Sequence, residues 1–567
     1  MIFKSIYPSI DIPALDIGQF ILQHIDTHEF WQDRTRPVYI DAATAEVLTV
    51  GQFRTQVTEL ASGWRHRVNL KPGTVVAMVS PNTIFFGVLT LSVILAGGVV
   101  AFVNPTYTAG EMAYQLQDSG AHYMVVDNEI ATKTLEAATM AELPHSRIYQ
   151  TGPSPSDPKE RGGRGGMTGS SLPSIMEQRD TRPWQQPPTI PPNTPAYICY
   201  SSGTTGLSKG VVLTHRNMVA NVSQVNAFTT HNQNTHNGQT LAGVLPLFHT
   251  YALHLLLHLN FIQGFTTIIF RKFRFEPFLQ AVERFRIHCA YLVPPVIVAL
   301  FKNPLTKLYD LSSLNRVVSG AAPFSAELVK EILDCYHTRV HQGYGLSEAS
   351  PVVLFTAPQT QDLGSVGILI PNMEAKFVDG KGKELGYGEQ GELCIRGPNV
   401  MLGYLNNPEA TAQTIDADGF LHTGDLGYVD ENGEFYITDR FKELIKYKGF
   451  QVPPAELEAI LVAHPKVRDV VVIGVNDVQQ ITEVPRALVV LQPKYQRDDS
   501  QLSRAAVAQE LIAYVNSQVA HHKHLRGGVY FIDAIVKSAA GKILRREMRE
   551  MHLKSIQARE DEGLGMA

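Results

Sequence analysis

The chain has 567 residues, of which 44% are hydrophobic and 18% are charged, and its formal net charge is −5. These values are typical of an ordinary globular enzyme, and the length gives a prior of roughly four domain units, so we expect at least two separate hydrophobic cores. The charge balance lacks the basic excess of a nucleic-acid-binding protein, and we do not expect nucleic acid as a partner.

The four cysteines, Cys199, Cys289, Cys335 and Cys394, lie far apart and form no Cys-x-x-Cys pair. This spacing predicts free thiols in a reducing compartment and indicates neither a disulfide framework nor a zinc site. The N-terminus has no apolar region of signal-peptide length, and the last residues do not form a Ser-Lys-Leu address. A cytoplasmic location is therefore predicted.

The first part of the chain, to about residue 190, alternates between strand and helix patterns. Thr74–Val79 reads as a buried strand, Ala109–Asp118 begins an amphipathic helix, and Tyr123–Val126 reads as the next strand. Such alternation predicts an α/β fold with a doubly wound sheet.

Ile84 to Val103 is an uncharged segment of twenty residues, long enough to cross a bilayer. However, Gly97 and Gly98 interrupt it, and the residues that follow are largely β-branched. A buried helix, a glycine stop and a buried strand explain the segment better than a membrane span.

Ser154 to Asn193 is dominated by Pro, Gly, Ser and Arg and has little periodicity. We predict a mobile surface loop, whose role the sequence leaves open.

The stretch from Tyr200 to Gly210 combines three glycines with small hydroxyl residues and Lys209, and it lies between two apolar segments. Glycines let backbone N–H groups turn toward an anion, hydroxyls donate hydrogen bonds, and the Lys supplies positive charge. This pattern favours a polyphosphate ligand over a simple Ser/Gly linker. A Walker loop does not fit, because Ser208 stands where that pattern needs Gly.

The rest of the chain changes character twice. Residues 241 to 323 are apolar and aromatic, whereas residues 364 to 430 contain short strands broken by Gly and Asp-Gly, the pattern of a small antiparallel barrel or sheet. Beyond Arg440 the sequence predicts a compact α+β terminal domain. Its expected elements are a helix from Pro454, strands at Val467–Val475 and Ala487–Leu491, and a helix at Ser503–Val519.

The loop at Tyr200–Gly210 resembles the phosphate-binding signature of the adenylate-forming superfamily, which includes acyl-CoA synthetases, 4-coumarate:CoA ligases, luciferases and adenylation domains. The resemblance extends from about residue 30 to residue 550. It implies a large N-terminal adenylation part (1–440), with doubly wound sheets and a small β-barrel, and a smaller mobile C-terminal domain (441–567). In the family the loop holds the β- and γ-phosphates of ATP, which assigns that role to Ser201, Ser202, Gly203, Thr204, Thr205, Gly206 and Lys209.

Two further motifs resemble the nucleotide-binding segments of the same family. In Gly343-Tyr-Gly-Leu-Ser-Glu-Ala349 the resemblance implies that Tyr344 stacks on adenine, Ser347 approaches the α-phosphate and Glu348 holds Mg²⁺; Gln342 and Gly343 are further nucleotide contacts. Thr423-Gly-Asp425 implies that Asp425 accepts hydrogen bonds from the ribose hydroxyls, with Arg440 as a second ribose or phosphate contact.

The segment from Arg440 to Glu458 is close to a family consensus. It implies a hinge at Lys442, an AMP contact at Lys446, and a CoA channel lined by Lys448 and Gly449. Lys272 matches another CoA contact.

Gly541-Lys542 resembles the last signature of the family, in which Lys542 bridges the substrate carboxylate and the α-phosphate. Lys542, Glu348 and Lys209 are thus the expected catalytic residues, acting by neutralising phosphate charge. The family usually has a Pro a few residues earlier, whereas this chain reads Val536-Lys-Ser-Ala-Ala.

The acid-binding pocket is also assigned by resemblance to 4-coumarate:CoA ligases, at His249, Tyr251, Leu255, Ala322, Gly343 and Val352. Leu255 stands where those ligases use a Ser near the phenol. Because Leu cannot hydrogen-bond a ring hydroxyl, we expect an apolar acid, either aliphatic (fatty or polyketide-type) or simple aryl.

Together these motifs predict an ATP-dependent acyl-CoA ligase that forms acyl-AMP and then transfers the acyl group to CoA, using ATP and Mg²⁺. Two alternatives stay open: a ligase that loads an acyl-carrier protein or a synthase, and a catalytically inactive nucleotide-binding homologue. The sequence does not set the acid, its chain length, the pathway or the oligomeric state.

Overall fold

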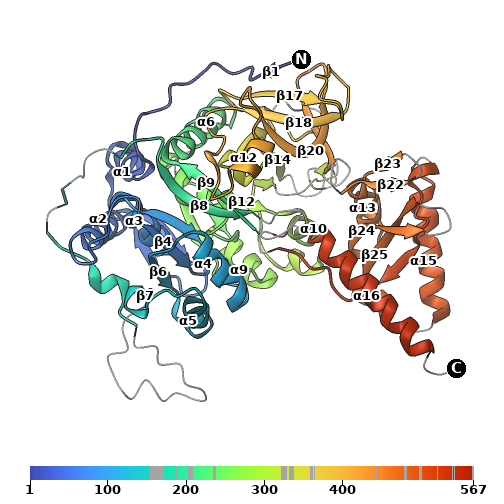
Figure 1. The fold of residues 1–567 in the computed structure, drawn as a ribbon, viewed down its shortest axis with the longest axis horizontal. Coiled ribbons are helices and arrows are strands. Elements are labelled where there is room, and N and C mark those ends of the chain that lie inside the picture. Colours follow the sequence, from blue (N-terminus) through green and yellow to red (C-terminus); the bar gives the residue numbers. More distant parts are fainter. Residues whose placement is uncertain are drawn as a thin grey trace.

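The computed structural model describes the chain except for residues 153–171, 183, 186–189, 202–207, 234–237, 321–328, 331, 333–337, 358–359, 361, 363, 441–442, 448–449, 478–481, 497–500, 520, 539–540, 542 and 565–567. Three large sheets make up the described N-terminal part, and two small sheets follow residue 440. Figure 1 shows the residues after β21 as a separate unit at one side of the molecule, ending in helix α16. This α/β architecture confirms the predicted fold class.

The first large sheet has seven strands in the order β19-β9-β8-β5-β4-β6-β7. Its central strands are parallel, and β9 adds an antiparallel hairpin arm to β8. The strands are β4 (Val75–Val79), β5 (Val99–Phe102), β6 (Tyr123–Val126), β7 (Ile148–Gln150), β8 (Pro195–Ser201), β9 (Lys209–Thr214) and β19 (Gly403–Tyr404). The β8–β9 pair therefore frames the predicted phosphate loop.

The second large sheet has nine strands in the order β16-β15-β14-β13-β12-β10-β11-β2-β3. It is parallel from β14 to β2 and antiparallel at both ends. The strands are β2 (Pro37–Asp41), β3 (Val47–Thr49), β10 (Thr240–Gly243), β11 (Thr266–Ile269), β12 (Cys289–Leu292), β13 (Arg316–Ser319), β14 (Arg339–Gly345), β15 (Val352–Phe355) and β16 (Ile368–Leu369).

The third sheet has five antiparallel strands in the order β1-β17-β18-β20-β21. The strands are β1 (Phe3–Lys4), β17 (Glu374–Val378), β18 (Gly391–Arg396), β20 (Leu421–Val429) and β21 (Phe435–Arg440). The pairing among the described strands runs from β1 to β21, and Phe435 of β21 also bridges Gly367, which precedes β16 of the nine-stranded sheet.

The α-helices that accompany these sheets are α1 (Ile17–Thr27), α2 (Val50–His66), α3 (Phe86–Leu95), α4 (Ala109–Asp118), α5 (Ala131–Met140), α6 (His215–Gln233), α7 (Thr250–Ala252), α8 (Asn260–Ile262), α9 (Phe275–Phe285), α10 (Pro294–Lys302) and α12 (Pro408–Thr414). Helices α2 and α4 begin with capping boxes, in which a Thr and the residue three positions later bond each other's backbone N–H groups. Between α7 and α8 the chain forms a π-helix, η6 (Leu253–Leu259).

The uncharged segment from Ile84 to Val103 folds as a buried helix followed by a buried strand. Helix α3 is buried along its whole length, Gly97 follows it with a φ of 92°, and β5 begins at Val99. Among the helices that the structure describes, none is both long and apolar enough to cross a membrane.

The predicted mobile loop at Ser154–Asn193 is wrong for residues 172–182. Leu172 and Ile175 are buried, and the 3₁₀ helix η5 (Ile175–Gln178) packs on α2. The Asp180 N–H donates to the carbonyl of Glu59 at 2.9 Å. A few apolar residues within a polar stretch thus attach this segment to the core, while residues 153–171 lie outside the described part of the chain.

The C-terminal part contains the hairpin β22 (Ile445–Tyr447) and β23 (Phe450–Val452), and a sheet of β24 (Val467–Asp477), β25 (Thr482–Leu491) and β26 (Val529–Phe531). Its helices are α13 (Pro454–Ala463), α14 (Pro493–Gln496), α15 (Gln501–Asn516) and α16 (Arg545–Leu564). The predicted elements are confirmed, with α15 ending three residues before the expected Val519. A hydrophobic cluster of its own runs from Ile445 to Met548.

Gly63 of α2 tests the attachment of η5. A Cβ at this position would lie 1.9 Å from the carbonyl oxygen of Gln178, so Gly63→Ala forces the backbone of η5 away from the helix. We expect a loss of about 1–3 kcal/mol in unfolding free energy, as for other overpacked positions, measured by thermal and urea unfolding.

Gly110→Ala is the matched control, because it is also a helical glycine and a Cβ there meets only the Met140 side chain at 4.0 Å. This control should gain about 0.5–1 kcal/mol from helix propensity. Equal effects of the two substitutions would show that η5 does not pack on α2 as described.

Candidate active site

The predicted nucleotide-binding residues come together where the three large sheets meet. Lys209 begins β9 of the seven-stranded sheet, Tyr344 lies on β14 of the nine-stranded sheet, and Asp425 lies on β20 of the five-stranded sheet. Glu348 belongs to the short helix η8 (Ser347–Ala349) that follows β14. Residues far apart in sequence are therefore carried by neighbouring elements, and Figure 1 shows β9, β14 and β20 in the same part of the molecule.

Glu348 is held on both its side chain and its backbone. The Tyr404 hydroxyl donates to Glu348 Oε1 at 3.0 Å, and the Met401 N–H donates to the Glu348 carbonyl at 2.8 Å. Burial and the nearby carboxylate raise the pKa of the Tyr404 phenol, so the hydroxyl keeps its proton and remains a donor. These bonds fix the orientation of the carboxylate.

Lys209 lies beside the same tyrosine. Its Nζ is 4.8 Å from the centroid of the Tyr404 ring, within the range of a cation–π contact. Tyr404 thus contacts both a carboxylate and an ammonium group, one through its hydroxyl and one through its ring. The pairing of Ser201 with Lys209 across β8 and β9 places both ends of the phosphate loop next to each other.

Tyr344 and Asp425 are joined directly. The Tyr344 hydroxyl donates to Asp425 Oδ2 at 2.7 Å, and Asp425 is 5% exposed. Asp425 also stands opposite Arg440 in the register of β20 and β21. The aromatic ring of Tyr344 and the carboxylate of Asp425 are therefore held side by side.

The segment that carries His249 and Tyr251 contacts the Gly343–Ala349 motif at Ser347. The hydroxyls of Thr250 and Ser347 are 3.2 Å apart, and the Tyr251 hydroxyl donates to the Val318 carbonyl at 3.4 Å. Burial lowers the pKa of His249 to about 4, so the imidazole is neutral at pH 7.

The predicted pocket residue Leu255 lies on η6 and is 2% exposed. Val352 is also buried, and its carbonyl accepts hydrogen bonds from the side chains of Asn221 and Asn399. Gly343 pairs with Phe355, and a Cβ at Gly343 would lie 3.3 Å from the Phe355 ring. Gln342 is buried on β14.

Two further predicted site residues lie within the described chain: Lys272 is exposed after β11, and Lys446 lies on β22. The remaining predicted residues lie outside the described residues: Ser202, Gly203, Thr204, Thr205, Gly206, Ala322, Lys442, Lys448, Gly449 and Lys542.

Gly541 shows where the C-terminal loop lies. A Cβ at Gly541 would be 2.9 Å from Val293, the residue that precedes α10 of the large N-terminal part. Further along, Arg545 pairs with Glu458 at 2.8 Å and also with Glu443. Gly541 therefore lies against the N-terminal part, whereas Arg545 is bound within the C-terminal part.

Sequence reasoning missed Tyr404 and Thr250. Neither belongs to a Gly-rich or charged motif, and only the fold brings their hydroxyls to Glu348 and Ser347. Nothing in the sequence around Gly403-Tyr404 indicates a contact with residue 348.

Comparison with known proteins identifies the family. The model of the AMP-binding enzyme family matches residues 28–405, and that of the AMP-binding enzyme C-terminal domain matches residues 456–542. The chain belongs to the AMP-binding enzyme family. It is 36% identical over 571 residues to "Probable 4-coumarate--CoA ligase 1" of Dictyostelium discoideum, covering 97% of this chain and 98% of the relative.

Other relatives agree with this assignment. The chain is 37% identical over 556 residues to "4-coumarate-CoA ligase 1" of Narcissus pseudonarcissus, covering 97% of this chain and 96% of the relative. The solved structure of ATP-bound MatB from Rhodopseudomonas palustris aligns with a TM-score of 0.79 at 25% identity, covering 95% of this chain and 99% of that one. The chain is therefore an ATP-dependent, AMP-forming acid–CoA ligase, and a small-molecule acid, ATP and CoA are its substrates.

Tyr404 offers a direct test of the Glu348 contact. In Tyr404→Phe the ring remains beside Lys209, but the hydrogen bond to the carboxylate is lost. A hydrogen bond to a charged group contributes about 1.5–3 kcal/mol, so kcat/KM for ATP should fall roughly ten- to hundredfold. In Tyr404→Leu, which also removes the ring, kcat/KM for ATP should fall further. Unchanged ATP kinetics in Tyr404→Phe would contradict a role for this bond.

His254 of η6 should make the stability of the protein depend on pH. It is fully buried, burial lowers its pKa to about 3, and neither ring nitrogen has a hydrogen-bond partner within the described chain. The unfolded chain takes up a proton near pH 6.5 while the folded chain does not, so stability falls as the pH drops below 6.5. This single residue should lower the free energy of unfolding by about 2 kcal/mol between pH 7 and pH 5.

His254→Leu should therefore be neutral or stabilising at pH 7 and should reduce the loss of thermal stability between pH 7 and pH 5. His66→Leu, at an exposed position of α2, is the control and should leave the loss of thermal stability between pH 7 and pH 5 unchanged. A slope unaffected by His254→Leu would mean that this histidine is charged in the folded protein.

Proposed function

We propose that this ligase activates an apolar carboxylic acid, aliphatic or simple aryl, and that Lys209, Glu348 and Lys542 carry the adenylation step. The observation that supports the proposal most strongly is the arrangement around Tyr404, where the predicted phosphate-binding Lys209 and the predicted metal-binding Glu348 share one anchor. The acid carboxylate would attack the α-phosphorus of ATP, giving acyl-AMP and pyrophosphate. The CoA thiol would then displace AMP.

In the first step the residues act by charge. Lys209 would contact the β- and γ-phosphates, and Lys542 would bridge the acid carboxylate and the α-phosphate, so that charge built up on the phosphorus oxygens is offset. Tyr344 would stack on adenine while Asp425 accepts from the ribose hydroxyls, a geometry favoured by the bond between these two side chains.

Glu348 would hold Mg²⁺, since a carboxylate oxygen suits a hard cation bound alongside phosphates. The bound ion would supply further neutralisation of the phosphate charge. The Tyr404 hydroxyl would keep this carboxylate oriented. Ser347 would approach the α-phosphate from the same short helix.

The apolar substrate class is supported by the environment of Leu255. Leu253, Leu255, Leu256 and Leu257 are all buried on η6, so this helix offers aliphatic surface. The relatives in Dictyostelium and Narcissus are named for 4-coumarate, a phenolic acid. The proposal is therefore tested by comparing acids that have and lack the ring hydroxyl. If Leu255 meets the ring, a hydroxyl there loses a hydrogen bond to water and gains none.

The two moving units proposed for catalysis are residues 1–440 and 441–567, with a hinge at Lys442. The two family matches, which end at residue 405 and begin at residue 456, lie on either side of this boundary. The separate hydrophobic cluster from Ile445 to Met548 also supports it. Lys446, Lys448, Gly449 and Lys272 would contact AMP or CoA in the second half-reaction.

The test is pyrophosphate release from ATP with Mg²⁺ over a panel of straight-chain, branched, cinnamic and 4-coumaric acids, each with and without CoA. A buried unsatisfied hydroxyl costs about 1–3 kcal/mol, so kcat/KM should favour cinnamate over 4-coumarate roughly ten- to hundredfold, and Leu255→Ser should narrow or reverse that ratio. A wild-type preference for 4-coumarate would overturn the apolar assignment.

Lys542→Ala separates the half-reactions. Adenylation should fall about 10²–10³-fold, as when one charge-stabilising donor is removed, while acyl-CoA formation from supplied acyl-AMP should persist. Equal loss in both half-reactions would contradict the role assigned to Lys542. If acyl-CoA forms only slowly, an acyl-carrier protein added in place of CoA tests the alternative acceptor.

A further inference from the structure

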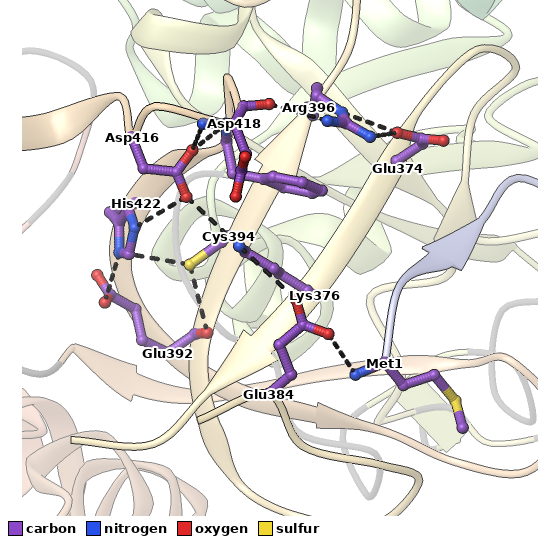
Figure 2. Close-up of polar contacts among 11 residues, drawn as sticks. Met1, Glu374, Lys376, Glu384, Glu392, Cys394, Arg396, Asp416, Asp418 and His422 are labelled. Carbon is purple, nitrogen blue, oxygen red and sulfur yellow. Dashed lines mark hydrogen bonds and ion pairs between the residues drawn. The ribbon is translucent and has the colours of Figure 1, made fainter. Parts of the chain in front are cut away.

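The five-stranded sheet brings together three side chains that ligate metals in other proteins. Cys394 of β18 and His422 of β20 are direct cross-strand partners, and Glu392 lies two residues before Cys394, on the same face of the strand. A register shift between Glu392 and Cys394 lets both side chains approach the one imidazole. Figure 2 shows the three side chains pointing toward one another.

The possible ligand atoms of the three side chains lie close to one another. His422 Nδ1 lies 3.0 Å from Glu392 Oε2 and 3.4 Å from Cys394 Sγ, and one ligand atom from each residue falls within 4.8 Å of the others. With zinc–nitrogen and zinc–oxygen bonds near 2.0–2.2 Å and a zinc–sulfur bond near 2.3 Å, tetrahedral coordination needs ligand separations of about 3.3–3.6 Å. The two distances from Nδ1 are close to that range.

The imidazole faces negatively charged groups on both sides. Its Nδ1 meets Glu392, while its Nε2 lies 3.6 Å from Asp416 Oδ2. A cation bound at Nδ1 would therefore also face the Glu392 carboxylate and the Cys394 sulfur.

The Asp416 carboxylate next to His422 is held by several groups of its own. Its carboxylate accepts the backbone N–H groups of Phe420 at 2.8 Å and Asp418 at 2.9 Å, and Lys376 Nζ lies 3.4 Å from it. A metal-ligating histidine characteristically donates its other N–H to a carboxylate, which fixes the tautomer and the ring orientation. Figure 2 shows Asp416 on the side of His422 away from Glu392.

We propose that Glu392 Oε2, Cys394 Sγ and His422 Nδ1 form a zinc-binding site, with Asp416 orienting the histidine. The mixed set of one oxygen, one sulfur and one nitrogen ligand suits Zn²⁺, and water would complete the tetrahedron. On binding, the Cys394 thiol releases its proton to solvent and the sulfur bonds the metal. The two resulting negative ligands balance the charge of the ion.

The site is reachable and is tied to the nucleotide region. The His422 and Glu392 side chains are 32% and 26% exposed, which gives the ion a path from solvent to the buried Cys394. The other oxygen of Glu392, Oε1, accepts the Gly424 N–H at 3.0 Å, and Gly424 precedes Asp425. A metal on Oε2 therefore clamps the carboxylate that holds this turn.

The spacing rules for cysteine did not predict this site, because Cys394 and His422 are 28 positions apart in sequence. Only the antiparallel pairing of β18 with β20 makes them neighbours.

Titration of the full-length, metal-free protein with Co²⁺ tests the site. A thiolate-to-cobalt charge-transfer band in the near ultraviolet, growing to one equivalent and displaced by Zn²⁺, is expected for the wild type. Cys394→Ser should abolish the band, and His422→Gln should abolish or strongly weaken it. Cys289→Ser, which removes a buried thiol of β12, is the matched control and should retain it.

Asp416→Asn keeps all three ligands and tests the outer shell, with an expected loss of about 10–100-fold in Zn²⁺ affinity. Zinc should also raise the thermal unfolding midpoint of the wild type but not of Cys394→Ser, since a ligand bound only by the folded state stabilises it. The proposal is overturned if the wild type shows no stoichiometric band, or if the band survives in Cys394→Ser. It is overturned equally if Zn²⁺ leaves the unfolding midpoint unchanged.

Discussion

The hydrogen bond from the Tyr404 hydroxyl to the Glu348 carboxylate joins elements of two sheets at the point where the nucleotide is expected to bind. Tyr404 comes from the edge of the seven-stranded sheet and Glu348 from the helix after β14 of the nine-stranded sheet. The bond from Tyr344 to Asp425 makes a similar connection to the five-stranded sheet. Because each sheet has its own packing, these side-chain bonds hold the charged groups in register across the junction.

Tyr404 contacts both charged side chains at this junction. Lys209 lies against its ring, and Glu348 accepts a hydrogen bond from its hydroxyl. In the proposed mechanism Lys209 would contact phosphate and Glu348 would hold Mg²⁺, so one tyrosine would position both groups.

Much of the fold was predictable, because it depends on local patterns. The helix, glycine stop and strand between Ile84 and Val103 followed from a double glycine and β-branched residues, and the order of the motifs indicated the family. Contacts made by single hydroxyls were not predictable, since Tyr404 and Thr250 carry no motif.

The segment at 172–182 was misread because a polar, Pro-rich composition hid the few apolar residues that anchor it. The cluster of Glu392, Cys394 and His422 depends on strand pairing, which sequence spacing does not show. The cytoplasmic location and the absence of a nucleic-acid partner stay predictions.

In the proposed mechanism the acid carboxylate attacks the α-phosphorus of ATP. The most direct measurement uses an acid whose carboxylate oxygens are labelled with ¹⁸O, with turnover in the presence of ATP and CoA, followed by mass spectrometry of the products. We predict one labelled oxygen in each AMP released, because the bridging oxygen of acyl-AMP stays with phosphorus when the thiol attacks the acyl carbon. Unlabelled AMP, with the label in orthophosphate or pyrophosphate, would contradict the account.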